Sequence, residues 1–385
     1  MKYNLADICE YAKGKVDVAI LDDETYISTE NMIPNKGGIT SASSLPTIAQ
    51  TQAFLAGDVL VSNIRPYFKK IWFAEFDGGC SNDVLVFRAK DGVSKRFLYY
   101  VLADDTFFDY SMATSKGTKM PRGDKAAIMK YEVPDFTYEE QEKIAGILEV
   151  LDRKIQINTE INENLEEQAR SIFQSWFIDY EPFGGAAPSD WFPSTLGQVA
   201  IMKTDSWSPA KNPGVVVEHY SIPAFDEKHY PVFEIASEIK SNKYILTPES
   251  VMISKLNPDT KRIWRPVCLS EYPVCSTEFI VYEAKKNGQR DYIYSLIDSI
   301  PFFNHLCSHT TGSTNSRQRA TPKTTLEFSF LLPPDSVIEE FCHIVTPMYD
   351  LITSNIVENQ SLSKTRDSLL PRLMSGELDV SDLDL

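Results

Sequence analysis

The chain has 385 residues, of which 43% are hydrophobic, and this length suits two or three domains with real cores better than one. The formal net charge of −16 would by itself argue against nucleic-acid binding, and the lack of any apolar run of about 18 residues predicts no membrane span. Six scattered cysteines without a CxxC pair predict reduced thiols in a cytoplasmic protein rather than a zinc site or a disulfide framework.

Residues 1–138 are predicted to form an α/β globular domain. The stretch around Pro66 is rich in β-branched and aromatic residues, which predicts a strand on each side of the proline. A further strand is expected over 83–88 and a helix over 95–110. The segment 115–125 is polar, basic and contains glycine, which predicts a loop.

A long helix is predicted over 139–178. Its apolar residues follow one another at steps of four and three for more than four heptads. Asn158 and Asn162 interrupt this seam near its middle. Two glycines and two prolines predict a linker at 179–190, and a second globular part is expected at 191–335.

The same helical pattern returns over 336–375 and is followed by a tail at 376–385. Asn355 and Asn359 again lie in the middle of the seam. Pro347 is expected to kink this helix or to shorten its start, because proline lacks an amide donor and clashes with the preceding turn.

The chain therefore reads as two copies of one unit, each a globular part followed by a long helix. VLVSNIRP at 59–66 aligns with VMISKLNP at 251–258, and Lys70-Ile71-Trp72 aligns with Arg262-Ile263-Trp264 at the same offset of 192. The globular parts otherwise differ in sequence, which indicates one architecture with two different specificities.

The two helices are expected to run antiparallel, because the second globular part is compact and its two ends lie near each other. Pairing residues whose numbers sum to 517 fills every layer of the two seams. Paired asparagines in the central layers are expected to fix the register at some cost in stability. The predicted helix-pairing residues are Leu151, Ile155, Asn158, Asn162, Leu165, Ile352, Asn355, Asn359 and Leu362.

Basic segments occur at equivalent places in the two copies. They lie at 59–74 and 111–125 in the first copy and at 251–266 and 310–325 in the second, and they contain few acids. Polar and aromatic residues are interleaved with the cations, as phosphate and base-edge contacts require. Ordinary solvated loops are the alternative, but the repetition in register favours a nucleic-acid surface.

No pattern indicates catalysis or metal binding. The sequence has no P-loop motif, no Asn/Asp-Pro-Pro-Tyr/Phe tetrapeptide of the amino-methyltransferases, and no glycine-rich turn after a strand. His305 and His309 have a helical i,i+4 spacing, but such a lone pair is more often surface chemistry than a metal site. We therefore predict no catalytic residue, no metal ligand and no cofactor in this chain.

Three stretches carry a resemblance to a known family. The core INENLEEQARSIFQSWF of the first helix, the following WFPSTLGQVA and the C-terminal LLPRLMSGELDV resemble the specificity subunit of a type I restriction-modification system. The resemblance covers essentially the whole chain in order. It implies an α+β fold in which two similar α/β target-recognition domains are separated and joined by two long antiparallel coiled-coil helices, as a pseudo-two-fold internal repeat.

The resemblance also implies the function. A specificity subunit is not itself an enzyme; it reads a bipartite, asymmetric site on double-stranded DNA and docks two methylase subunits and motor-nuclease subunits. S-adenosylmethionine, ATP and Mg are expected on those partners. A coiled-coil scaffold that binds only protein is the main alternative, and a fused methylase-nuclease is disfavoured by the missing catalytic domain.

Base-edge and phosphate contacts are expected from the cations and polar residues of the four basic segments. The candidates for one half-site are Arg65, Lys69, Lys70, Lys116, Thr118, Lys119 and Arg122, and those for the other are Lys255, Asn257, Lys261, Arg262, Arg265, Arg317, Gln318 and Arg319.

Overall fold

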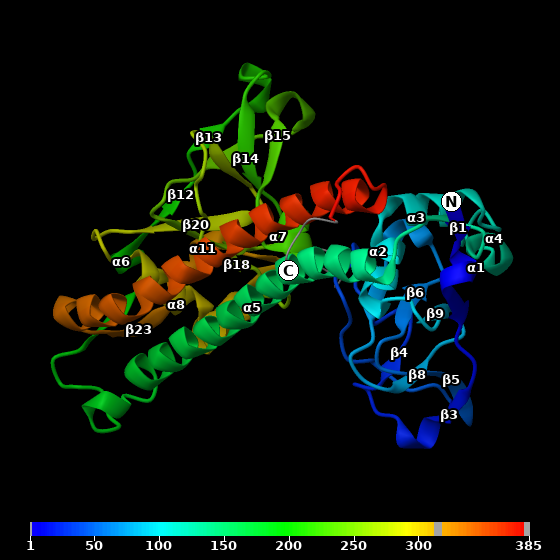
Figure 1. The fold of residues 1–385 in the computed structure, drawn as a ribbon. Helices are drawn as coiled ribbons and strands as arrows, with labels where there is room; N and C mark the ends of the chain where they lie inside the picture. Colours follow the sequence, from blue (N-terminus) through cyan, green and yellow to red (C-terminus); the bar gives the residue numbers. More distant parts are fainter. Residues whose placement is uncertain (1, 312–317, 381–385) are drawn as a thin grey trace. The chain divides into compact units, whose positions relative to one another are not determined.

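The computed structural model describes residues 2–311 and 318–380. The chain divides into two compact units, of which the first comprises residues 1–156 and 359–385 and the second comprises residues 157–358. Two 40-residue helices, α5 (Tyr138–Phe177) and α11 (Asp335–Met374), contribute one part to each unit. Their labels and those of the other elements are drawn in Figure 1.

Two four-stranded sheets form the globular part of the first unit. One is antiparallel in the order β2 (Cys9–Tyr11), β9 (Val84–Ala89), β6 (Val59–Ser62) and β7 (Ile71–Phe73). The other has the order β3 (Lys15–Asp17), β5 (Gln50–Phe54), β8 (Gly78–Cys80) and β4 (Tyr26–Ile27), with β4 parallel to β8. β1 (Lys2–Asn4) pairs with β10 (Glu132–Pro134).

The helices of the first unit pack on the sheet that contains β6. They are α1 (Leu5–Ile8), α2 (Lys95–Ala103), α3 (Asp105–Ala113) and α4 (Lys125–Ile128). The expected single helix over 95–110 is wrong, because Asp104 has extended backbone angles and its carboxylate caps α3 by accepting from the amide of Thr106 at 2.8 Å. Leu98 of α2 joins Leu148 of α5 and Leu373 of α11 in one buried cluster.

The second unit repeats the sheet that contains β6. Its order is β12 (Ala200–Lys203), β20 (Phe279–Ala284), β17 (Ser250–Ser254) and β18 (Ile263–Trp264). Leu60 opposes Trp72 in the first unit, and Met252 opposes Trp264 in the second. These residues stand at the offset of 192 found in the sequence, so the α+β class and the internal repeat are confirmed.

Among the described residues, the other elements of the second unit form three further sheets and five short α-helices. A five-stranded sheet has the order β13 (Ser206–Trp207), β16 (Lys243–Ile245), β19 (Pro273–Ser276), β14 (Val216–Tyr220) and β15 (Val232–Ile235). β11 (Phe192–Thr195) pairs with β23 (Ser329–Leu332), and β21 (Thr310–Thr311) pairs with β22 (Arg319–Ala320). The helices are α6 (Leu196–Val199), α7 (Ile222–Lys228), α8 (Arg290–Asp298), α9 (Ile300–Ser308) and α10 (Pro322–Thr325).

The long helices pair antiparallel in the second unit. The Asn355 amide donates to Asn162 Oδ1 at 2.9 Å, and the Asn158 amide donates to Glu358 Oε2 at 2.7 Å. Residues 162 and 355 sum to 517, which is the layer expected from the sequence. α11 begins at Asp335 and is continuous through Pro347, so the expected shortened start is wrong, and the expected kink stays a prediction.

The first unit also holds an antiparallel pair of helical segments. Arg366 Nη1 meets Asp152 Oδ1 at 2.7 Å, and the Asn359 amide donates to the Ile155 carbonyl at 3.4 Å. Arg366 therefore lies along the apolar seam with its charge satisfied by an acid of the facing helix.

No helix in residues 2–311 or 318–380 is long and apolar enough to cross a membrane.

Candidate nucleic-acid interface

The two units share an unusual backbone arrangement at the end of equivalent strands. Arg65, which follows β6, has a φ of 51°, and Asn257, which follows β17, has a φ of 46°. Each precedes a proline, and residues other than glycine rarely adopt this left-handed region. Strained backbone of this kind gathers at functional sites because the surrounding structure must hold it in place.

Backbone bonds from the second basic segment hold each strained residue. The amide of Arg65 donates to the Pro121 carbonyl at 2.8 Å, and the amide of Asn257 donates to the Gln318 carbonyl at 2.9 Å. A bridge also joins Ile64 to Arg122 in the first unit, as one joins Leu256 to Arg319 in the second. In each unit, two basic segments far apart in sequence thus lie side by side.

Exposed cations of the first unit gather on the segment 115–124. The Lys116 side chain is 81% exposed and meets Asp124 Oδ2 at 2.5 Å. Arg122 is 54% exposed and meets Asp83 Oδ1 at 3.1 Å. Thr118 and Lys119 are also exposed. Such surface ion pairs are weak, so these cations are free to exchange a carboxylate for a phosphate.

Lys69 and Lys70 are more enclosed than the cations of 115–124. Lys69 Nζ lies 2.8 Å from Asp105 Oδ2, and Lys36 Nζ lies 2.9 Å from the other oxygen of the same carboxylate. Lys70 Nζ donates to the Thr29 carbonyl at 2.7 Å, and burial lowers the pKa of Lys70. Lys70 therefore supports a loop and is a weaker candidate for a DNA contact than Lys69.

An aromatic turn on this surface was missed by the sequence analysis. The turn Pro66–Phe68 exposes 49% of Tyr67 and 37% of Phe68. The amide of Asn35 donates to the Phe68 carbonyl at 2.8 Å, which fixes the turn. The aromatic pair directly follows Arg65 and Pro66 and could have been found there, whereas the tertiary contact of Lys36 has no signal in the sequence.

In the second unit, two arginines of the corresponding basic segments each bind a carboxylate through two nitrogens. Arg319 is 47% exposed and holds Glu278 with Nε and Nη2 at 3.0 and 3.1 Å, which raises the pKa of Arg319. Arg262 holds Asp226 in the same two-point manner at 2.6 and 3.0 Å, but its side chain is only 13% exposed. Lys261 pairs with Asp298. Of the remaining candidates, Lys255 is half-buried and Arg317 lies outside the described residues.

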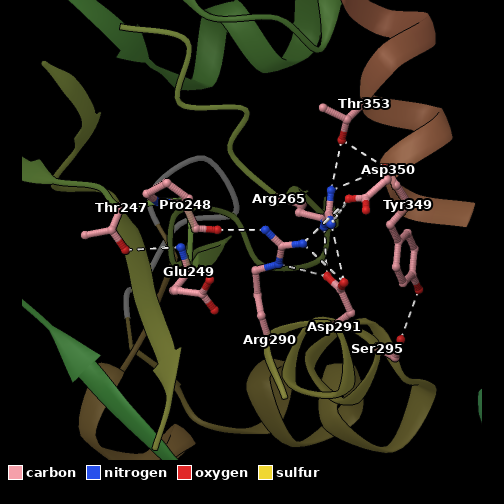
Figure 2. Close-up of polar contacts among 10 residues, drawn as sticks. All are labelled: Thr247, Pro248, Glu249, Arg265, Arg290, Asp291, Ser295, Tyr349, Asp350 and Thr353. Carbon is pink, nitrogen blue, oxygen red and sulfur yellow. Dashed lines mark hydrogen bonds and ion pairs between the residues drawn. The ribbon is translucent and has the colours of Figure 1, made fainter. Parts of the chain in front are cut away.

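Arg265 does not belong to this surface. Its side chain is only 8% exposed and meets Asp291 Oδ1 at 2.8 Å and Asp350 Oδ1 at 2.6 Å. It also donates to Thr353 Oγ1 at 3.0 Å (Figure 2). These bonds link the residue after β18 to α8 and α11, and this burial makes Arg265 a weaker candidate for a DNA contact than the exposed Arg319.

Comparisons with known proteins agree with this architecture. Residues 1–167 match the family described as the type I restriction modification DNA specificity domain. The type I restriction enzyme MjaIX specificity subunit of Methanocaldococcus jannaschii is 26% identical over 76% of this chain and 71% of its own length. The HindI specificity subunit of Haemophilus influenzae is 24% identical over 98% of this chain and 99% of its own length.

A solved structure shares the fold. The type I restriction-modification S subunit of M. genitalium superposes with a TM-score of 0.59 at 17% identity, covering 97% of this chain and 96% of that one. At this identity the structural likeness shows the fold alone, and the repeated sheet and paired helices of this chain agree with it. This chain is thus similar in sequence to specificity subunits of type I restriction enzymes over most of its length, and its first 167 residues match their DNA specificity domain.

Proposed function

We propose that this chain is the sequence-reading subunit of a type I restriction-modification complex and that each unit reads one half of a bipartite, asymmetric DNA site. The observation that carries the proposal is the repeated backbone bond between two basic segments, from Arg65 to Pro121 and from Asn257 to Gln318. This backbone pairing of two basic segments, called the basic frame below, is the same in both units, but the side chains that it presents differ. One frame with two sets of side chains is what two different half-sites require.

The proposed division of labour follows from side-chain chemistry. Arg122 and Arg319 read guanine edges, because a guanidinium can donate to two acceptors of one base. Asp83 and Glu278 hold these guanidinium groups at the surface before DNA arrives. Lys116 contacts phosphate, which positions the protein without carrying sequence information.

The outward faces of the long helices are the proposed docking surfaces for two methylase subunits. In the second unit Ile157, Ile161 and Leu351 are 41%, 39% and 46% exposed, and in the first unit Val150 is 68% exposed. Apolar side chains at such exposure favour a protein partner. Motor-nuclease subunits join the methylase, and S-adenosylmethionine, ATP and Mg belong to those partners.

Methylation mapping tests the proposal. The chain is co-expressed with its methylase, and residues 1–138 are then replaced by the equivalent domain of a relative. We expect one half of the methylated sequence to change and the other half to stay. Methylation of the same site without the chain, or a change in both halves after the exchange, would refute the division of labour.

A protein-binding scaffold without DNA recognition is the second candidate, because the net charge of −16 is unfavourable to DNA. The basic frame repeated in the two units argues against a scaffold without DNA recognition. Binding of a labelled duplex by the methylase with and without this chain separates the two. Sequence-specific binding only in the presence of the chain excludes the scaffold.

A further inference from the structure

A cavity in the second unit lies between β12, β20 and the start of α10. Its volume is about 380 Å³, which falls within the range of ligand pockets. Met202, Tyr244, Phe279 and Val281 supply an apolar and aromatic lining. Lys255, which lies two residues before Asn257 in the same basic segment, also lines it, so the cavity borders the paired basic segments of the second unit.

Of the three lysines that line the cavity, only one has an ion-pair partner among the described residues. Lys203 also lines the cavity but meets Asp205 at 3.0 Å. In the part of the chain that the structure describes, neither Lys255 nor Lys323 has an ion-pair partner. An apolar cavity with two unpaired ammonium groups suits a flat, apolar body that carries an anionic group.

In the first unit, a tyrosine occupies the position that Met202 occupies in the second unit. Strand pairing sets Cys9 against Ala89 and Ala200 against Ala284, so Tyr11 is the counterpart of Met202. The Tyr11 hydroxyl donates to the Lys125 carbonyl at 3.0 Å, at the start of α4. Tyr11 thus spans from the sheet to the short helix, whereas Met202 has neither ring nor hydroxyl to do so.

We propose that this cavity binds a nucleotide, with its base against Tyr244 and Met202 and its phosphate at Lys255 and Lys323. The inference rests on the proposed function, because Lys255 belongs to a basic frame that contacts DNA. The nucleotide is one swung out of the duplex bound by the second unit. A base removed from the stack regains contact by packing on aromatic and apolar side chains.

The test uses the chain in complex with its methylase and DNA carrying 2-aminopurine at single positions of the second half-site, outside the methylated base. We expect one position to brighten on binding, because 2-aminopurine fluoresces when it leaves the stack. Met202→Tyr, which copies the first unit, should abolish this brightening. Met202→Leu is the matched control, because it keeps a side chain of similar volume and leaves the cavity open.

Lys323→Ala provides a second variant in which folding is not at issue, since this side chain is exposed. We expect Lys323→Ala to raise about tenfold the concentration of complex needed for half-maximal brightening, as for a lost hydrogen bond to a charged group. If no position brightens, or if Met202→Tyr leaves the brightening intact, the proposal is overturned. Methylation of the wild-type site stays normal in that case, so the failure differs from a failure of the proposed function.

A free nucleotide has the same chemistry and is tested separately. The monophosphate of 2-aminopurine riboside is titrated into the complex without DNA. Binding that Met202→Tyr abolishes, in the absence of brightening in DNA, would overturn the swung-out base and assign the cavity to a free nucleotide. Brightening in DNA without binding of the monophosphate supports the proposal as stated.

Discussion

Replacing Arg265 with alanine is expected to destabilise the second unit by about 3–5 kcal/mol, because it removes one member of a buried charge cluster. The Asp291 side chain is 3% exposed and lies 2.8 Å from the Arg265 guanidinium. After the change, Arg290 at 3.0 Å is the remaining ion-pair partner of Asp291 among the described residues. Asp350, which is 62% exposed, can instead be solvated and contributes less.

Urea unfolding followed by tryptophan fluorescence measures this loss. Four of the five tryptophans lie within residues 157–358, so the signal reports mainly on the second unit. With a denaturant slope of about 1–3 kcal/mol per molar, the midpoint should fall by at least roughly 1 M. Arg265→Lys should lose less, about 1–2 kcal/mol, since lysine keeps the charge but not the two-point geometry.

Arg319→Ala is the matched control for this prediction. Arg319 is exposed and pairs only with Glu278 among the described residues. We expect its loss to leave the urea midpoint unchanged and to weaken binding of the cognate duplex about tenfold. Arg265→Ala should lower the urea midpoint and leave binding of the cognate duplex by the folded protein unchanged. An unchanged midpoint for Arg265→Ala, with a shallower salt dependence of DNA binding, would show that Arg265 contacts phosphate and that its assignment to the interior is wrong.

Three further predictions concern the paired helices, the aromatic turn and a buried histidine. Replacing both Asn162 and Asn355 with leucine should raise the melting temperature and permit slipped helix pairing, detected as extra species in ion-mobility spectra; a single species would contradict a role in register. Tyr67→Ala should lower affinity for the first half-site without changing the melting temperature, and an equal loss at both half-sites would contradict it. Burial lowers the pKa of His219 despite its 2.5 Å contact with Glu234, so the folded state binds this proton less readily than the unfolded state. Stability should therefore fall as the pH drops below about 6.5, and His219→Asn should reduce that fall between melting curves at about pH 7.5 and 5.5.

The sequence by itself determined the helices and the repeat. The 4-3 spacing of apolar residues predicted both long helices to within one residue at each end, because a seam of that period can be buried only in a helix. The paired motifs at 59–66 and 251–258 predicted two equivalent strand ends. Each of these patterns is read from the order of residues within a short stretch, which can then be compared with a second stretch of the same chain.

Only the tertiary structure decided which cations face solvent. Arg265 and Arg319 both come from basic segments of the second copy, yet Arg319 is 47% exposed whereas Arg265 is 8% exposed and lies against Asp291 and Asp350. The acids that bury Arg265 come from α8 and α11, far along the chain. The cavity beside Lys255 is equally non-local, because it depends on Met202 standing where the first unit has Tyr11. Composition records that a charge is present, but its burial depends on partners that the fold brings from elsewhere.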